Sequence, residues 1–281
     1  NKQTFIPLQM NSWVRIIRPV NGIMGIVGTV VSAIIALGID LTPRLVTVAI
    51  ASVCVFLVIS GGNVINDIVD VETDRINHPE RPLPSGKISR NAALYFSVFS
   101  FGLAIVLSAL FISVYSVILV ILAEGLLVSY EIKTKKLGLT GNITISILVG
   151  LIFIFGGVSV GVVTRMVLLF IMATLANFSR EIIKDIQDME GDVDRKTFPR
   201  LHGVKSSAII AIASVVAAVA TSFVPYLLSI FNIYYIYAVV VSDVFFLISA
   251  ALITRDAKRS QNVSKLAMIL GLVSFAVGGV T

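Results

Sequence analysis

The sequence NDIVDVETD at residues 66–74 returns in outline as KDIQDMEGD at residues 184–192. Both stretches contain the pattern D-I-x-D-x-E-x-D. The chain is 57% hydrophobic and only 14% charged, so two dense acidic clusters stand out against their surroundings. One cluster alone would fit a solvated helix end. Carboxylates are costly at the edge of a membrane, however, so two matching clusters predict a functional site.

The composition excludes an ordinary soluble domain. Mean hydropathy is +0.97 over 281 residues, whereas soluble domains are about half apolar and about a quarter charged. Apolar stretches of about 17–25 residues are long enough to cross a bilayer as helices. We therefore predict an all-α, polytopic membrane bundle of nine transmembrane helices, formed by a single domain over residues 1–281. The predicted spans are residues 19–37, 45–65, 92–112, 114–129, 142–163, 166–183, 206–224, 231–253 and 263–280.

The basic residues predict the orientation of this bundle. With nine spans, all but two of the 22 Lys and Arg residues fall on the same side as the N-terminus, the exceptions being Arg44 and Arg165. Cytoplasmic loops of membrane proteins are enriched in Lys and Arg, so we expect that side to be cytoplasmic. Both acidic stretches lie there, where the loops would cap the site. The net charge of +6 is then a topology signal and does not indicate nucleic-acid binding.

The two stretches are separated by four spans and so point the same way. An internal repeat of a four-helix unit would leave this arrangement, and we treat such a duplication as a hypothesis.

Helical spacing would align the oxygen atoms of each stretch. Asn66, Asp70 and Asp74 are four residues apart and would lie on one face of a helix. The second stretch reaches the same alignment in steps of three and four residues, through Asp185, Asp188 and Asp192. Like charges at this spacing repel, so a cation must offset the repulsion. Oxygen ligands without Cys or paired His favour Mg²⁺.

Basic side chains accompany both acidic stretches. Arg75 and Arg81 follow the first, while Arg180 and Lys184 lie at the beginning of the second. Mg²⁺ links carboxylates to phosphate oxygens, and Arg or Lys neutralises the charge that remains. Beside apolar spans, such a site predicts a substrate with a charged diphosphate head and a long apolar tail.

The paired motifs resemble the signatures of the UbiA superfamily of intramembrane prenyltransferases. The matching patterns are Asn66-x-x-x-Asp70-x-x-x-Asp74 with Arg81-Pro82 downstream, and Asp185-x-x-Asp188-x-x-x-Asp192. The resemblance covers nearly the whole chain, since that family also has nine spans with both motifs at cytoplasmic helix ends. Residues 18–22, 76–86 and 180–192 resemble most the branch that makes archaeal ether lipids, although residues 76–86 also resemble chlorophyll synthases.

The resemblance implies a reaction. Members of that branch transfer a geranylgeranyl group from its diphosphate to the hydroxyl of geranylgeranylglyceryl phosphate and release diphosphate. Two Mg²⁺ ions would bridge the diphosphate, one held by Asn66 and Asp70 and the other by Asp188 and Asp192. The further or supporting metal ligands would be Asp67, Asp74 and Asp185. The catalytic set is expected to contain Asp70, Asp74, Asp188, Asp192 and Tyr130.

Other polar residues are candidates for contact with the two substrates. The ring of Tyr130 would face an allylic cation. Arg18 and Asn21 are candidates for the phosphoglycerol head of the acceptor. The remaining candidate phosphate contacts are Arg75, Arg81, Lys133, Lys135, Lys136, Arg180 and Lys184. For Lys135 and Lys136, an ordinary positively charged loop explains the sequence equally well.

Three other functions fit part of the pattern. A prenyltransferase with an aromatic acceptor would serve quinone or chlorin synthesis. A cation-coupled transporter would also use acidic clusters, but transporter ion sites tend to lie near the bilayer midplane. A CDP-alcohol phosphotransferase would need a D-G-x-x-A-R signature, which the sequence lacks. The acceptor, the prenyl length and the oligomeric state stay open at this point.

Overall fold

The computed structural model describes residues 11–189 and 196–279, and within these ranges the protein consists of helices and connecting loops, without strands. Within them, nine helices are long and apolar enough to cross a membrane, which confirms the predicted fold class. The elements are α1 (Ser12–Ile17), α2 (Pro19–Leu37), η1 (Gly38–Arg44), α3 (Leu45–Val69), α4 (Val71–Asn77), α5 (Arg90–Phe111), α6 (Val114–Ile132), η2 (Thr134–Lys136), α7 (Leu139–Val160), α8 (Met166–Gln187), α9 (Phe198–Ser222), α10 (Val224–Leu227), α11 (Ile233–Leu252) and α12 (Ala257–Gly279).

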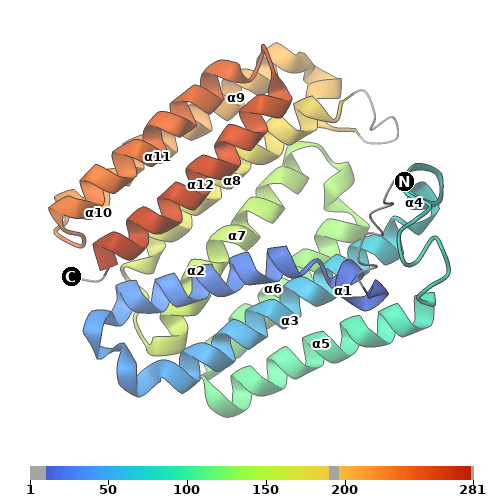
Figure 1. The fold of residues 1–281 in the computed structure, drawn as a ribbon, viewed down its shortest axis with the longest axis horizontal. Coiled ribbons are helices and arrows are strands. Elements are labelled where there is room, and N and C mark those ends of the chain that lie inside the picture. Colours follow the sequence, from blue (N-terminus) through green and yellow to red (C-terminus); the bar gives the residue numbers. More distant parts are fainter. Residues whose placement is uncertain (1–10, 190–195, 280–281) are drawn as a thin grey trace, which may run out of the picture.

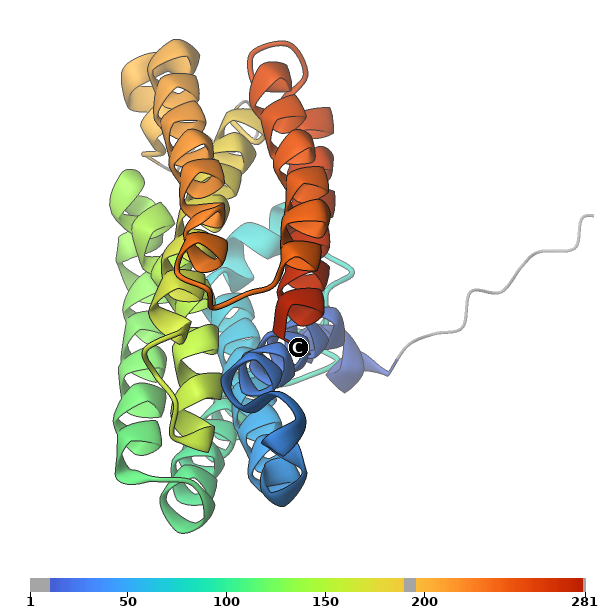
Figure 2. The same ribbon diagram turned by 90° about the vertical axis from the view of Figure 1, so that its left-hand side faces the viewer.

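The spanning helices form two groups. The N-terminal group contains α2, α3, α5, α6 and α7, and the C-terminal group contains α8, α9, α11 and α12. The groups are joined where α7 packs along α8 and where α2 contacts α12. Figure 1 shows the helices running side by side, and in Figure 2 the C-terminal helices α9, α11 and α12 occupy the upper part of the view. Each group contains one helix that ends in an acidic motif.

The apolar core follows the same division. One cluster of buried side chains lies mainly among α2, α7, α8, α11 and α12 and includes Phe153, Met172 and Phe275. A second lies among α3, α5, α6 and α7 and includes Val55 and Val120. Many large apolar side chains on the outer surface are exposed, as expected for helices that face lipid.

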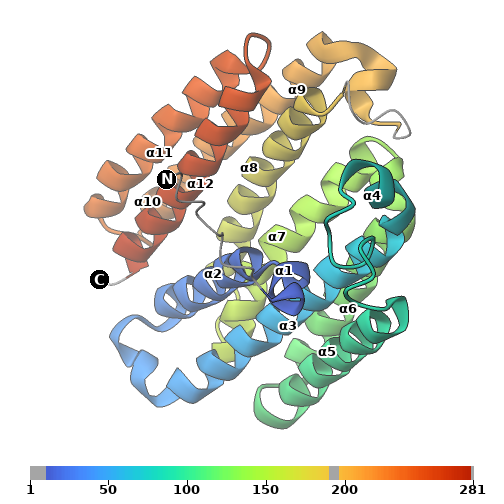
Figure 3. The same ribbon diagram turned by 45° about the vertical axis from the view of Figure 1, so that its right-hand side comes forward.

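A small cap covers the end of the bundle at which α3 and α8 finish, which we call the motif end. It consists of α1, α4 and the segment of residues 78–89, and Figure 3 shows α4 beside the end of α3. Ile16 of α1 packs with Leu83 and Ile88 of the segment against the end of α3. The guanidinium of Arg15 donates to the Glu80 carbonyl at 3.0 Å and to its carboxylate at 3.2 Å. The backbone around Glu80 and the charge of Arg15 lower the pKa of the Glu80 carboxyl.

The first acidic stretch is divided between two helices, and here the expected continuous ladder is wrong. The helical run of α3 ends at Asp70, whose φ of −89° and ψ of 5° lie outside the helical range, and α4 begins at Val71. The backbone N–H of Asp74 still donates to the Asp70 carbonyl at 2.8 Å, so the chain turns only slightly. The break nevertheless gives Asp70 and Asp74 different surroundings.

Candidate active site

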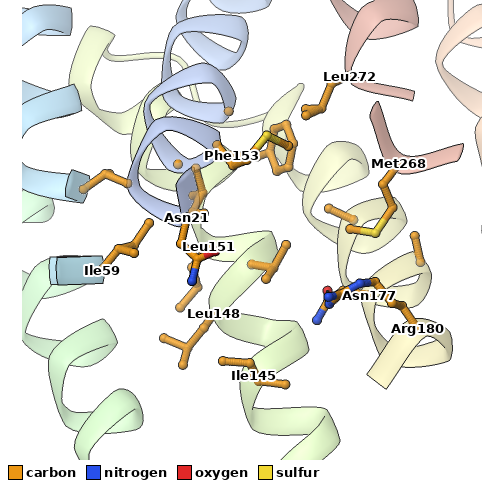
Figure 4. Close-up of a pocket in the computed structure, with 18 of the residues that line it drawn as sticks. Asn21, Ile59, Ile145, Leu148, Leu151, Phe153, Asn177, Arg180, Met268 and Leu272 are labelled. Atoms are coloured by element: carbon orange, nitrogen blue, oxygen red, sulfur yellow. The ribbon is translucent and has the colours of Figure 1, made fainter. Parts of the chain in front are cut away.

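A cavity of about 810 Å³ lies between the two groups of helices. Its walls are almost entirely apolar and come from α2, α3, α6, α7, α8, α9, α11 and α12. In Figure 4, Ile59 lies on one side and Met268 and Leu272 on the other, with Leu148 of α7 between them. Most polar lining residues gather toward the motif end, where Asn66 of the first motif and Lys184 of the second both border the same space. Ser222, Ser242 and Asp243 line it farther from that end, on α9 and α11.

Arg18 joins the N-terminal helices to the first motif. It lies between α1 and α2 in the left-handed region, with φ of 50° and ψ of 67°. A non-glycine residue in this region is held there by its surroundings. Its guanidinium donates to Asn66 Oδ1 at 2.9 Å and to the buried Asp67 carboxylate at 2.5 Å. The turn before α2 therefore aims Arg18 at the motif.

A buried lysine supplies the cation that the first motif requires. Lys135 Nζ donates to both oxygens of Asp70 at 2.8 Å and to Glu131 Oε2 at 2.8 Å. The Asn66 amide donates to the same Glu131 oxygen at 2.8 Å. The Lys135 side chain is only 2% exposed. Burial of a charge is tolerated only where it is paired and hydrogen-bonded, as it is here.

The rest of the first motif pairs with arginines. Arg81 from the cap segment donates to the nearly buried Asp74 carboxylate at 2.6 Å. Arg75 instead pairs with Glu72 at 2.8 Å, and both of these side chains are largely exposed. The cap segment is thus held to α4 by a partly buried ion pair, while the Arg75 pair lies on the surface.

The second motif follows a polar stripe on α8. Asn177, Arg180, Glu181 and Lys184 recur at helical spacing, and all four line the cavity. Arg180 donates to Glu181 at 2.7 Å and to the Asn177 side chain at 3.4 Å. Figure 4 shows Asn177 and Arg180 together on α8.

The carboxylates of the second motif follow this stripe. Asp185 accepts a hydrogen bond from the Asn142 amide of α7 at 2.8 Å. Asp188 ends α8 as its C-terminal capping residue. Asp192 lies outside the described residues.

The structure divides the predicted site residues into three sets. Those that line the cavity are Arg18, Asn21, Asn66, Tyr130, Arg180 and Lys184. Asp67, Asp70 and Lys135 stand behind them and contact Arg18, Asn66 or Glu131. The lining does not include Asp74, Arg75, Arg81, Lys133, Lys136, Asp185 or Asp188, and their roles toward substrate stay predictions.

Several polar residues of the site were missed by sequence reasoning, among them Asn63, Glu131, Asn177, Glu181 and Lys265. Glu131 carries a signal, because it precedes Lys135 by four residues at the end of a helix. Asn177 carries one as well, since it lies one helical turn before Arg180. Lys265 of α12 also lines the cavity, and nothing in its local sequence separates it from the other basic residues of that side.

The oxygen atoms around Lys135 fit a hard cation. Among the described residues, no three His, Cys, Asp or Glu side chains are grouped as a metal centre. The Lys135 ammonium lies between Asp70 and Glu131, so this cluster of oxygens already accommodates a positive charge. Carboxylate and amide oxygens are the ligands that Mg²⁺ prefers. The Asp70 and Glu131 carboxylates therefore match the chemistry of the expected metal. The Asn66 amide turns its nitrogen toward them, and its oxygen accepts from Arg18.

Comparisons with known proteins agree with this geometry. The model of the UbiA prenyltransferase family matches residues 26–275. Digeranylgeranylglyceryl phosphate synthase from Methanothermobacter thermautotrophicus is 39% identical over 279 residues, with 97% of each chain covered. The enzyme of the same name from Methanocaldococcus jannaschii is 38% identical over 281 residues, again with 97% of each chain covered.

Solved structures give the same result. A structure described as a digeranylgeranylglyceryl phosphate synthase in membranes has a TM-score of 0.84 and 37% identity, covering 96% of this chain and 98% of its own. A UbiA homologue from Archaeoglobus fulgidus bound to DMAPP and Mg²⁺ has a TM-score of 0.73 at 17% identity, covering 95% of this chain and all of its own, and shares the fold. The fold, the paired motifs and these matches together show that the chain is a multi-pass membrane protein that belongs to the UbiA prenyltransferase family.

Proposed function

We propose that the protein transfers a geranylgeranyl group from geranylgeranyl diphosphate to the hydroxyl of geranylgeranylglyceryl phosphate and releases diphosphate. The observation that carries this proposal is one apolar cavity whose polar mouth is shared by the two acidic motif helices. An amphiphilic substrate fits such a space with its tail among the helices and its charged head at the mouth. The relatives at 38–39% identity carry the name of this activity.

The diphosphate head is placed by charges from both helix groups. Arg18 comes from the junction of α1 and α2, and Arg180 and Lys184 come from α8. Donors already in position stabilise the charge that develops on a leaving group without reorganisation during the reaction. Within this arrangement, Arg180 and Lys184 face the diphosphate, while Arg18 also contacts the phosphate of the acceptor.

Asn66, Asp70, Asp188 and Asp192 would hold Mg²⁺ in this scheme, as two ions, with Asp67, Asp74 and Asp185 in support. Bound there, the metal would neutralise diphosphate oxygens. Arg18 and Arg81 fix Asp67 and Asp74, so the carboxylates of the motif keep their positions.

Cleavage of the allylic C–O bond leaves a carbocation, and the cavity protects it. The apolar walls keep water away, so that the acceptor hydroxyl is the available nucleophile. Tyr130 lines the cavity beside Glu131, where its ring can stabilise the positive charge. The hydroxyl oxygen forms the new ether bond, and its proton leaves toward the diphosphate and solvent at the mouth.

We place this mouth on the cytoplasmic side, with residues 1–281 as one catalytic domain. The segments joining the helices at the motif end contain nearly all of the basic residues, which the positive-inside rule assigns to the cytoplasm.

The experiment that tests the function is a transfer assay with purified protein, Mg²⁺ and labelled geranylgeranyl diphosphate. Geranylgeranylglyceryl phosphate and 4-hydroxybenzoate are supplied as competing acceptors. We expect label only in the glyceryl phosphate product. Label in the aromatic product would support quinone or chlorin synthesis instead, and label in neither would refute the proposal.

A further inference from the structure

Helices α2 and α7 touch at the cavity wall, where Gly28 and Ile152 both line the space. A Cβ atom built at Gly28 of α2 would lie 3.0 Å from Ile152 of α7. A Cβ atom built at Gly156 of α7 would lie 2.6 Å from the Ser32 Cβ atom and 2.8 Å from the Thr29 carbonyl. Small residues let two helices approach this closely. No chain of methyl-branched carbons can pass between the helices at this contact.

The two faces of α7 beyond this contact belong to different surroundings. Ile152 and Phe155 pack with the cluster of α3 and α6, whereas Phe153 packs with the cluster of α8, α11 and α12. All three residues line the cavity. The contact between α2 and α7 therefore lies between two parts of the cavity wall, which we call the N-terminal lobe and the C-terminal lobe.

Each lobe has its own set of apolar lining residues and its own polar end near the mouth. The N-terminal lobe is lined by Cys54, Val58, Val120, Ala123 and Leu127, and its polar end contains Asn66 and Tyr130. The apolar lining of the C-terminal lobe is Met172, Ala173, Val239, Leu272 and Phe275, and its polar end contains Arg180, Lys184 and Lys265. Three polar residues also line this lobe between α9 and α11, namely Ser222, Ser242 and Asp243, and the Ser222 hydroxyl donates to Asp243 at 2.8 Å.

Both lobes are deep. Tyr130 and Leu119 of α6 both border the N-terminal lobe, and Lys265 and Phe275 of α12 both border the C-terminal lobe. At about 1.5 Å per helical residue, each pair spans roughly 15 Å or more along its helix. Each lobe therefore has the depth to receive most of a long isoprenoid chain.

We propose that each lobe holds one geranylgeranyl tail, that of the diphosphate donor in one lobe and that of the glyceryl phosphate acceptor in the other. This inference rests on the proposed function, because only a lipid acceptor brings a second long tail to the reaction. A small aromatic acceptor would need a single tail lobe. The contact between α2 and α7 lies below the mouth of the cavity. Two tails that enter separate lobes therefore leave their polar heads side by side at the mouth, where the ether bond forms.

Two matched pairs of variants test this assignment. Ala123→Phe narrows the N-terminal lobe, and Ala173→Phe narrows the C-terminal lobe. Ile121→Phe and Ile171→Phe are the controls, because these side chains lie on the same helices and are 52% and 37% exposed. Each protein is assayed with geranyl and geranylgeranyl diphosphates against glyceryl phosphates that carry a geranyl or a geranylgeranyl chain.

We expect each narrowing variant to lose about tenfold or more in kcat/KM with two full-length substrates, since a filled pocket rejects the longer chain. A shorter chain on one substrate should restore the kcat/KM of Ala123→Phe, and a shorter chain on the other substrate should restore the kcat/KM of Ala173→Phe. If the shortened donor rescues one variant and the shortened acceptor rescues the other, the result supports two tail lobes and shows which tail each lobe holds. The controls should behave as wild type.

Rescue of both variants by the same shortened substrate would overturn the inference, as would rescue of neither. If a phenylalanine prevents folding, Leu119→Phe and Leu272→Phe repeat the test with a smaller change in volume. A wild-type protein that alkylates no glyceryl phosphate of any chain length would instead refute the proposed function itself.

Discussion

The two acidic motifs share a pattern but differ in the neighbours that hold them. In the first, Asp67, Asp70 and Asp74 each pair with a cation from elsewhere in the chain, namely Arg18, Lys135 and Arg81. In the second, Asp185 accepts from the neutral Asn142 amide, and the nearby cations Arg180 and Lys184 lie on the same helix. The first motif therefore ties the cap and neighbouring elements together. The second lies at the end of α8, where Asp185 contacts α7 and where Arg180 and Lys184 pair with Glu181.

The largest expected effect is a loss of catalytic activity, because we propose that both motifs take the same part in catalysis. Asp70→Ala and Asp188→Ala should each lower kcat/KM by 100-fold or more, which is about 2.7 kcal/mol or more of transition-state stabilisation. In the proposed scheme, both changes remove an oxygen ligand of Mg²⁺ beside the diphosphate. Asp40→Ala, in η1 at the opposite end of the bundle, is the control and should keep wild-type activity. Full activity in either motif variant would separate that motif from catalysis.

The second-largest effect is a loss of folding stability, which we expect for the first motif only. Asp67→Ala leaves the Arg18 guanidinium without its carboxylate, whose side chain is 4% exposed. Because Arg18 is partly solvated, the free energy of unfolding should fall by about 2 kcal/mol, less than for a fully buried pair. Thermal unfolding in detergent measures this loss. An unchanged melting temperature would mean that the pair does not hold the motif.

A smaller loss is expected at the second motif. Asn142→Ala removes the amide that donates to Asp185 at 2.8 Å. One hydrogen bond to a charged acceptor contributes about 1.5–3 kcal/mol, and we expect the lower value beside solvent. Thr140→Ala, an exposed position on the same helix, is the matched control. A loss as large as that of Asp67→Ala would show that the two motifs are equally structural.

The smallest effect should come from the surface pair of α4. Arg75→Ala breaks a pair whose side chains are 59% and 75% exposed, so stability should change by about 0.5 kcal/mol or less. Arg81→Ala breaks the pair with the nearly buried Asp74 and should cost at least about 1 kcal/mol more. If Arg75→Ala and Arg81→Ala lowered the melting temperature equally, the distinction between the exposed Arg75 pair and the partly buried Arg81 pair would be contradicted.

Hydropathy predicted the fold well because lipid constrains helix length and composition so strongly. Pro19 and Gly38 even marked both ends of α2, since proline suits the first turn and Gly38 adopts a positive φ of 56°. The break at Asp70 left no local signal, because the apolar and acidic spacing continues smoothly through it. Nor could the sequence pair Lys135 with Asp70, which lies 65 residues away. Such contacts depend on how helices pack.

Donor binding tests most directly whether both motifs hold one diphosphate. Affinity for geranylgeranyl diphosphate in the presence of Mg²⁺ would be measured by calorimetry for wild type, Asp70→Ala, Asp188→Ala and the double variant. If one ligand touches both motifs, each single change should weaken binding by about 100-fold and the double change should add little more, because the sites are coupled. Additive losses in the double variant, or full affinity in either single variant, would contradict a shared diphosphate site.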